Sequence, residues 1–307
     1  MTGKKRTSSS AAASGGSAAS RRRTTASVAS AQRNQPELDA VQCNSEATAQ
    51  DNTAPQTLDE VTTPKLSKHI MNLIGSAAAA KRSLEWLLKV GLYDPRSENP
   101  TKKTDEELKE TASRAIKLGI FPTLLACMST FQDAEVIVEE ALAVFGALLW
   151  STDDLGDLLM AIELDAVASL FGSINAHPQN STILWMSFLS LGFCFWLEDG
   201  EGMENQRERN NVAISKLLEI DGSLSTILNS TDSEELKSHQ HANRNLMYLI
   251  DHLIACDDGL DVKYKMRELL VAEGAISKVA KVIETITEHE DVQKSARRAM
   301  CRLIQTD

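Results

Sequence analysis

The sequence GIFPTLL at residues 119–125 recurs three more times in altered form, and this repetition decides the fold. The other copies read DAVASLF at 165–171, GSLSTIL at 222–228 and GAISKVA at 274–280. In each copy a turn residue leads and an apolar residue follows two places later. A leading Gly or Asp can end one helix in a left-handed or capping conformation, and a Pro or Ser soon after it can begin the next. The leading residues are 46, 57 and 52 positions apart, so we expect four similar helical units.

A longer helix is predicted after each copy, starting near Asp133, Asn180, Ser233 and Glu290. Because each unit alone exposes an apolar face, the units must stack to bury it, which makes a superhelical solenoid. No run of alternating β-branched residues bounded by turns occurs, so the chain after its first 63 residues is predicted to be all-α. The extra length of the second unit falls in residues 198–211, which we interpret as an exposed acidic loop.

The helical region is predicted to begin near Leu66. Apolar residues from Ile70 to Ala78 keep the i, i+3, i+4 spacing of one helix face. Thr104 and Glu107 form a capping-box pattern ahead of the next helix. We therefore predict two parts, a tail and linker at 1–63 and a helical repeat domain at 64–307.

The tail is predicted to be disordered. Residues 1–60 contain no aromatic residue and few large aliphatic ones, so they cannot bury enough apolar area to offset the entropy of ordering. All seven charges before Glu37 are positive, and the rest of the chain carries −18. The basic clusters at 4–6 and 21–23 have three interpretations that the sequence leaves open: a nuclear-import signal, a transit peptide, or a solvated tail.

Composition excludes several classes of protein. The chain has 307 residues, a net charge of −11 and 42% hydrophobic residues. An acidic balance argues against general nucleic-acid binding, which needs a basic surface. The longest uncharged apolar run, residues 183–197, is too short to span a membrane. Five scattered cysteines without a CxxC pair favour a reducing compartment, the cytoplasm, with the nucleus as the alternative.

The repeated phrase, Gly-x-apolar-Pro/Ser-x-apolar-apolar, resembles that of the armadillo repeat family. In that family a long helix with the pattern Ala-x-x-Ala-Leu-x-Asn-Leu follows, and residues 292–303 are nearest to it. The resemblance covers about residues 105–307, with 66–90 as an N-terminal cap. It implies a right-handed α-solenoid that binds other proteins along its concave face and carries no catalytic site.

The alignment also implies what this face does not bind. Nuclear-import receptors of the family carry a ladder of Asn with Trp one turn earlier, and these grip basic peptides. The aligned Asn positions here are Ala147, Phe193, Tyr248 and Arg302, and the aligned Trp positions are Ala143, Leu189, Arg244 and Arg298. None matches, which argues against recognition of basic localisation signals by that mechanism.

The substituted residues define a candidate binding strip. Arg244 and Tyr248 share one helix face, and Arg298 and Arg302 repeat that spacing in the next unit, with Lys294 one turn earlier. An Arg/Tyr strip in an acidic protein favours carboxylate or phosphate groups, so we predict an acidic or phosphorylated partner segment. The alternative is a solvated face whose arginines pair with nearby Asp and Glu.

The remaining features give no chemistry. The sequence lacks GxGxxG, GxxxxGK[ST], HExxH and GxSxG, so we predict neither an enzyme nor a cofactor. His252 and Cys256 share a helix face, but further metal ligands cannot be assigned. The aromatic-rich stretch 185–196 is either solenoid core or an apolar docking surface, and residues 257–261 are interpreted as a helix-capping turn.

The predicted function is therefore that of a scaffold or adaptor. The alternative is a regulatory or chaperone cofactor that clasps a globular partner domain. The partner's identity and the oligomeric state are left open by the sequence.

Overall fold

The computed structural model describes residues 61–97, 103–152, 154–195, 203–237, 239–256 and 265–305. All helices of this part belong to one unit, Thr53–Asp307, and no strand occurs in these ranges. The predicted tail lies almost wholly outside the described residues, as does the turn at 257–261. The all-α prediction is confirmed.

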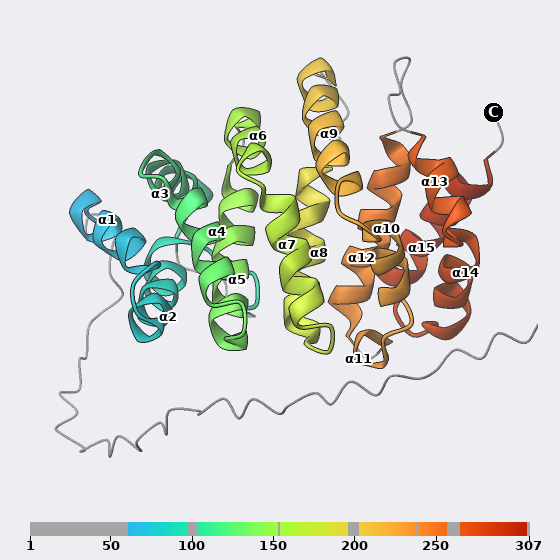
Figure 1. The fold of residues 1–307 in the computed structure, drawn as a ribbon, viewed down its shortest axis with the longest axis horizontal. Helices are drawn as coiled ribbons and strands as arrows, with labels where there is room; N and C mark the ends of the chain where they lie inside the picture. The colour runs from blue at the N-terminus through green and yellow to red at the C-terminus, as the bar shows by residue number, and fades with distance from the viewer. Residues whose placement is uncertain are drawn as a thin grey trace, which may run out of the picture. The chain divides into compact units, whose positions relative to one another are not determined.

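Four successive units each contain three main helices (Figure 1). In every unit, two helices lead to a third that lies against its neighbours in the adjacent units. The units are α3 (Asp105–Lys117), α4 (Ile120–Thr130) and α5 (Glu135–Ser151); α6 (Leu155–Glu163), α7 (Ala166–Ala176) and α8 (Ser181–Cys194); α9 (Met203–Leu218), α10 (Ser223–Ser230) and α12 (Gln240–Ala255), with the short α11 (Glu234–Lys237) before α12; and α13 (Met266–Ala272), α14 (Ala275–Thr285) and α15 (Glu290–Ile304).

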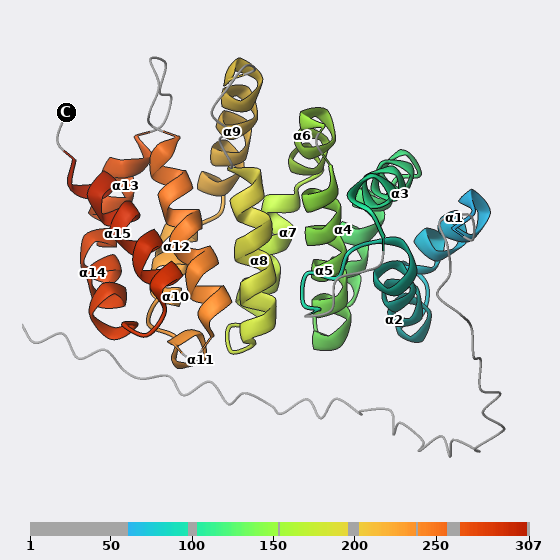
Figure 2. The same ribbon diagram turned by 180° about the vertical axis from the view of Figure 1, so that it is seen from behind.

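The third helices stack in chain order. α5 contacts α8, α8 contacts α12, and α12 contacts α15, while α4 with α7 and α10 with α14 pack in a second layer (Figures 1 and 2). At the N-terminal end α1 (Thr63–Asn72) lies against α4, and α2 (Ala77–Trp86), extended by a π-helical turn at Leu87–Gly91, lies against α5. This pair forms the expected N-terminal cap. The arrangement is an armadillo-like α-solenoid, and we call the side formed by α5, α8, α12 and α15 the long-helix face.

The four repeated phrases begin at the sharp turns between the first and second helix of each unit. Gly119, Asp165, Gly222 and Gly274 have φ of 79°, 74°, 71° and 87°, and no other residue of the described part has a positive φ. The left-handed conformation strains residues with a Cβ and suits glycine. The prediction that these residues end one helix and begin the next is confirmed.

Apolar burial joins the two layers into one continuous core. Phe121 of α4 and Phe145 of α5 are nearly fully buried, and their rings meet edge to face with centroids 5.5 Å apart. α5 is buried on nearly all sides because it lies between α2 and α8. Each such large side chain contributes roughly 1.5–3 kcal/mol when it is fully buried.

The predicted acidic loop at 198–211 is wrong for its second half. Residues from Met203 onward form α9, and Arg209 and Asn210 are each only 3% exposed. The apolar residues Ala213, Ile214 and Leu217 lie further along α9 and anchor it in the core. The first turns of α9 are acidic and rich in amides, so in the sequence they resemble a loop, and the apolar residues typical of a buried helix appear only in its later turns. Residues 198–202 lie outside the described part.

The predicted continuous apolar face from Ile70 to Ala78 is also interrupted. α1 ends at Asn72, and Ser76 caps α2 by accepting a hydrogen bond from the Ala79 amide at 3.3 Å. Ile74 is consequently 53% exposed in the turn. The capping box at the start of α3 is confirmed, with the Thr104 amide donating to Glu107 at 2.8 Å and the Glu107 amide donating to Thr104 at 3.3 Å.

No helix within the described ranges has both the length and the apolar character that a membrane crossing requires.

Candidate functional site

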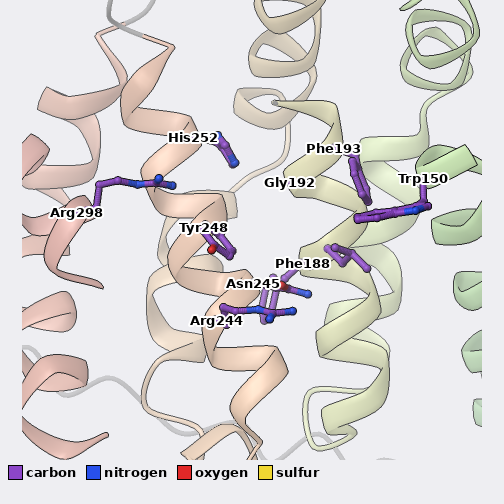
Figure 3. Close-up of a pocket in the computed structure, with 10 residues that line it drawn as sticks. Trp150, Phe188, Gly192, Phe193, Arg244, Asn245, Tyr248, His252 and Arg298 are labelled. Atoms are coloured by element: carbon purple, nitrogen blue, oxygen red, sulfur yellow. The ribbon is translucent and has the colours of Figure 1, made fainter. Parts of the chain in front are cut away.

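A groove of about 450 Å³ opens on the long-helix face (Figure 3). Its lining comes from four helices that are far apart in the sequence and adjacent in the stack. We call it the central groove, and its lining residues are Trp150 from α5, Phe188, Leu189, Gly192 and Phe193 from α8, Arg244, Asn245, Tyr248 and His252 from α12, and Arg298 from α15.

One side of the groove is aromatic. Trp150 stands at the end of α5 and is 63% exposed, which is unusual for the largest apolar side chain. Its ring meets that of Phe193 edge to face at 5.9 Å. Phe188 is fully buried beneath them. The aromatic stretch of α8 therefore fills the core with Phe188, as one interpretation expected, and adds Phe193 to the lining of the groove.

Gly192 keeps the aromatic side of the groove open. A Cβ placed on Gly192 would meet no atom within 4 Å. Since its φ lies outside the left-handed region, backbone conformation does not require a glycine here. The missing side chain therefore leaves room for a group from another molecule.

The opposite side of the groove carries positive charge. Arg244, Tyr248 and His252 follow each other at successive turns of α12, and Arg298 of α15 places its guanidinium 5.6 Å from the centre of the Tyr248 ring. None of the lining residues is acidic, in a chain whose net charge is −11. The groove therefore differs in sign from the protein as a whole.

A buried carboxylate positions two of the three arginines of α15. Asp251 of α12 is 1% exposed and forms ion pairs with the Nε atoms of Arg298 at 2.6 Å and Arg302 at 3.3 Å. Part of the predicted strip is thus paired with an acid, as the alternative interpretation expected. Neither Arg302 nor Lys294 lines the groove, and Lys294 is exposed one turn before Arg298 on α15.

Two donors at the groove have no hydrogen-bond partner among the described residues. They are Nδ2 of Asn245, a residue only 4% exposed, and Nε of Arg244. A buried polar group without a partner costs about 1–3 kcal/mol, so such groups are normally satisfied. Both side chains point from α12 toward α8 across the groove (Figure 3). Both donor atoms are closed to solvent, so it is the rest of the Arg244 guanidinium that can face a group entering the groove.

His252 is neutral near pH 7. Its pKa is lowered to about 4, chiefly by burial and also by the nearby arginines, while Asp251 opposes the shift. The positive charge of the groove therefore comes from arginine. The described residues, His252 and Cys256 among them, contain no group of three or more His, Cys, Asp or Glu suited to hold an ion.

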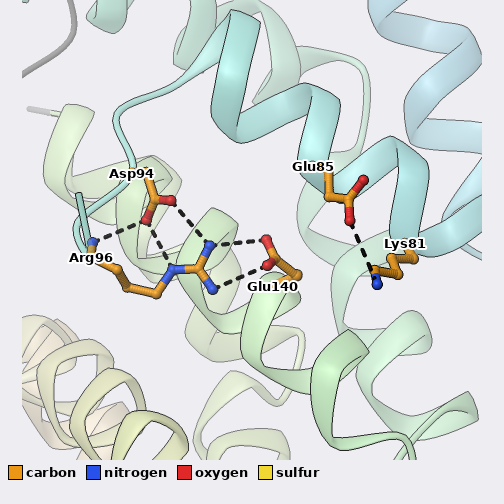
Figure 4. Close-up of polar contacts among 5 residues, drawn as sticks. All are labelled: Lys81, Glu85, Asp94, Arg96 and Glu140. Atoms are coloured by element: carbon orange, nitrogen blue, oxygen red, sulfur yellow. Dashed lines mark hydrogen bonds and ion pairs between the residues drawn. The ribbon is translucent and has the colours of Figure 1, made fainter. Parts of the chain in front are cut away.

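A separate charged cluster fixes the N-terminal end of the long-helix face (Figure 4). Arg96 donates to both carboxylate oxygens of Glu140 on α5, at 3.0 and 3.3 Å, and to both oxygens of Asp94 at 3.0 and 3.1 Å. Burial lowers the pKa of Arg96, but the hydrogen bonds and charges of these two acids outweigh burial and raise it. This fork joins the segment after α2 to α5. On α2 itself, Lys81 and Glu85 form an exposed ion pair at 3.8 Å, also drawn in Figure 4.

The sequence alignment locates the groove residues on three of the four helices. Leu189, Phe193, Arg244, Tyr248 and Arg298 all line the groove, whereas Ala143 and Ala147 of α5 are fully buried. Sequence reasoning missed Trp150, Gly192 and Asn245. The signals were present: a Trp at the last turn of an apolar helix, a Gly inside a helix that needs none, and an amide beside the aligned Arg244.

Comparison with known proteins adds little. No protein-family model matches the chain, and no curated protein matches it. Among solved structures, the chain is similar to the designed armadillo repeat protein YIII(Dq)4CqI, with 16% sequence identity, a TM-score of 0.46, and coverage of 81% of this chain and 95% of that one. The armadillo-like fold stated above rests on the order and contacts of this chain's own helices.

Proposed function

We propose that the protein is a non-catalytic binding protein whose long-helix face docks an acidic segment of a partner protein. The observation that carries the proposal is the central groove, where two arginines and no acidic residue line a hollow in a chain of net charge −11. Arginine, tyrosine and tryptophan, the residue types that most often anchor protein interfaces, all line it.

Charge separates this proposal from recognition of basic signals. A peptide rich in Lys and Arg would meet Arg244 and Arg298 with like charge, which opposes binding. Carboxylates and phosphates accept two hydrogen bonds from one guanidinium, so they match these side chains in both charge and geometry. The partner segment we propose is therefore acidic or phosphorylated.

Photo-crosslinking in the full-length protein tests the proposal. A photoreactive residue in place of Trp150 should attach to a partner in cell extract, and mass spectrometry should identify the attached segment as acidic. Arg244→Glu should abolish that crosslink, because it reverses the charge beside the site. Arg297→Glu, an equal change at an exposed position of α15 outside the groove, should leave it intact. An attached segment that is neutral or basic, or equal loss in both variants, would contradict the proposal.

A further inference from the structure

We propose that the central groove recognises an aromatic side chain that lies within about three residues of an acidic group in one linear segment. The inference rests on the proposed function, since it names what the docked segment must carry. Two separate parts of the groove lead to it: an aromatic hollow at Gly192, and guanidinium donors from α12 and α15.

The hollow at Gly192 fits a ring. Trp150 and Phe193 meet edge to face at 5.9 Å, and a further aromatic ring can make favourable offset or edge-to-face contacts with either of them. The 63% exposed Trp150 presents apolar area that is costly to leave in water, and the open space above Gly192 gives a ring access to it. An aliphatic side chain would fill the hollow but would lose the edge-to-face contacts.

The donors on α12 fit an anion. Arg244 brings one guanidinium to the groove, and Arg298 adds a second over the Tyr248 ring. A carboxylate or phosphate can accept two hydrogen bonds from one guanidinium, and no acidic residue lines the groove to compete for it. Charge complementarity thus predicts that the docked segment carries an acidic group as well as an aromatic ring.

Helix spacing fixes how far apart the two features lie in the segment. Packed helices are about 8–10 Å apart, so α8 and α12 hold the hollow and the donors roughly that distance from each other. An extended peptide rises about 3.3 Å per residue, which corresponds to roughly three residues. From α5 to α15 the groove crosses three such intervals, a span that suits an extended segment of roughly eight residues.

Gly192→Leu provides a selective block. An added Cβ there meets no atom within 4 Å, and leucine favours a helix more than glycine does, so folding should be retained. Gly172→Leu on α7 is the matched control, because a Cβ there also meets no atom within 4 Å and the residue lies outside the groove. Circular dichroism and thermal melting check that both variants fold as the wild type does.

A phage-displayed library of random 12-residue peptides, selected on the full-length protein, is the test. We expect enrichment of peptides with Phe, Tyr or Trp within three positions of Asp or Glu. Synthetic copies of the enriched peptides should bind the Gly192→Leu variant with an affinity at least about tenfold lower than that for wild type. Their affinity for the Gly172→Leu variant should lie within about twofold of wild type. Replacing the ring by Ala, or the acid by Lys, should each weaken binding about tenfold, and phosphoserine in place of the acid should preserve it.

The outcomes separate this inference from the proposed function. Enriched peptides that are acidic but lack a ring, or that bind Gly192→Leu as well as wild type, would overturn the aromatic hollow and leave acidic docking standing. Enrichment of basic peptides, or of none, would overturn both.

Discussion

Removing both arginines that contact Asp251 should destabilise the last repeat far more than removing either one. Asp251 is 1% exposed, so it cannot regain water when its partners leave. Breaking a buried ion pair by deleting one side costs about 3–5 kcal/mol, because a buried charge is left without compensation. We therefore expect Arg298→Gln/Arg302→Gln to lose about 3–5 kcal/mol of unfolding free energy.

Each single variant should lose less, because the other arginine remains. The Arg298 side chain is 50% exposed and its pair at 2.6 Å is partly screened, and Arg302 is 34% exposed with a longer contact at 3.3 Å. We expect roughly 1–2 kcal/mol for either change, in the range of a charge-assisted hydrogen bond. The loss in the double variant should thus exceed that of either single variant.

A third substitution separates the buried charge from lost packing. Asp251→Asn in the double variant removes the uncompensated carboxylate and should recover stability to within about 1–2 kcal/mol of wild type. Unfolding in urea followed by circular dichroism gives the free energies, and hydrogen exchange in α15 shows whether the loss is local, as expected for stacked repeats. A double variant no less stable than either single, or a triple variant no more stable than the double, would refute the reasoning.

Three further predictions concern backbone and pH. Gly192→Ala should raise the unfolding free energy by about 0.5–1 kcal/mol, measured by urea unfolding, because glycine inside a helix is unfavourable and the added Cβ meets no atom within 4 Å. A lower unfolding free energy would mean that the chain itself fills the groove. Gly274→Ala should destabilise it by about 1–2 kcal/mol, because φ is 87° there, and an unchanged midpoint would show that the turn relaxes. The pKa of His252, about 4, lies below its unfolded value of 6.5, so the stability gained by burying this histidine in its neutral form is complete above pH 6.5 and is lost as the pH falls to 4. His252→Gln should therefore reduce the dependence of the unfolding free energy on pH in that window, by an amount corresponding to at most one bound proton. An unchanged slope would exclude this histidine as its source.

The repeat architecture was predictable because it depends on local backbone chemistry. A left-handed turn strains any residue with a Cβ, so three of the four junctions are glycine and the fourth is Asp165. That constraint places a Gly or Asp at similar intervals along the sequence, where it can be recognised. α9 leaves no such mark at its start, because its polar first turns resemble a loop and only its later turns are apolar.

The groove was only half predictable, for a different reason. The positions of Arg244, Tyr248 and Arg298 follow from helix periodicity and the stacking of like units, which one sequence encodes. The exposure of Trp150 and the empty space above Gly192 depend on how α5 and α8 pack in three dimensions. The lack of a partner for Asn245 is likewise a property of the folded chain, since an amide in the sequence does not reveal what surrounds it.

Asp251 bears on how the groove would hold an acidic ligand. Its charge opposes an incoming anion, so the paired Arg298 offers less net attraction than a free arginine would. The same ion pair, at 2.6 Å, fixes the guanidinium beside Tyr248 before any ligand arrives. Immobilising a flexible side chain costs about 0.5–1.5 kcal/mol on binding, and that entropy has already been lost here.

Arg244, whose Nε has no partner in the described chain, supplies the uncompensated charge. The two arginines thus have different roles, since Arg244 provides attraction and Arg298 provides a fixed geometry. This combination favours selectivity for a shaped acidic segment over general attraction to anions.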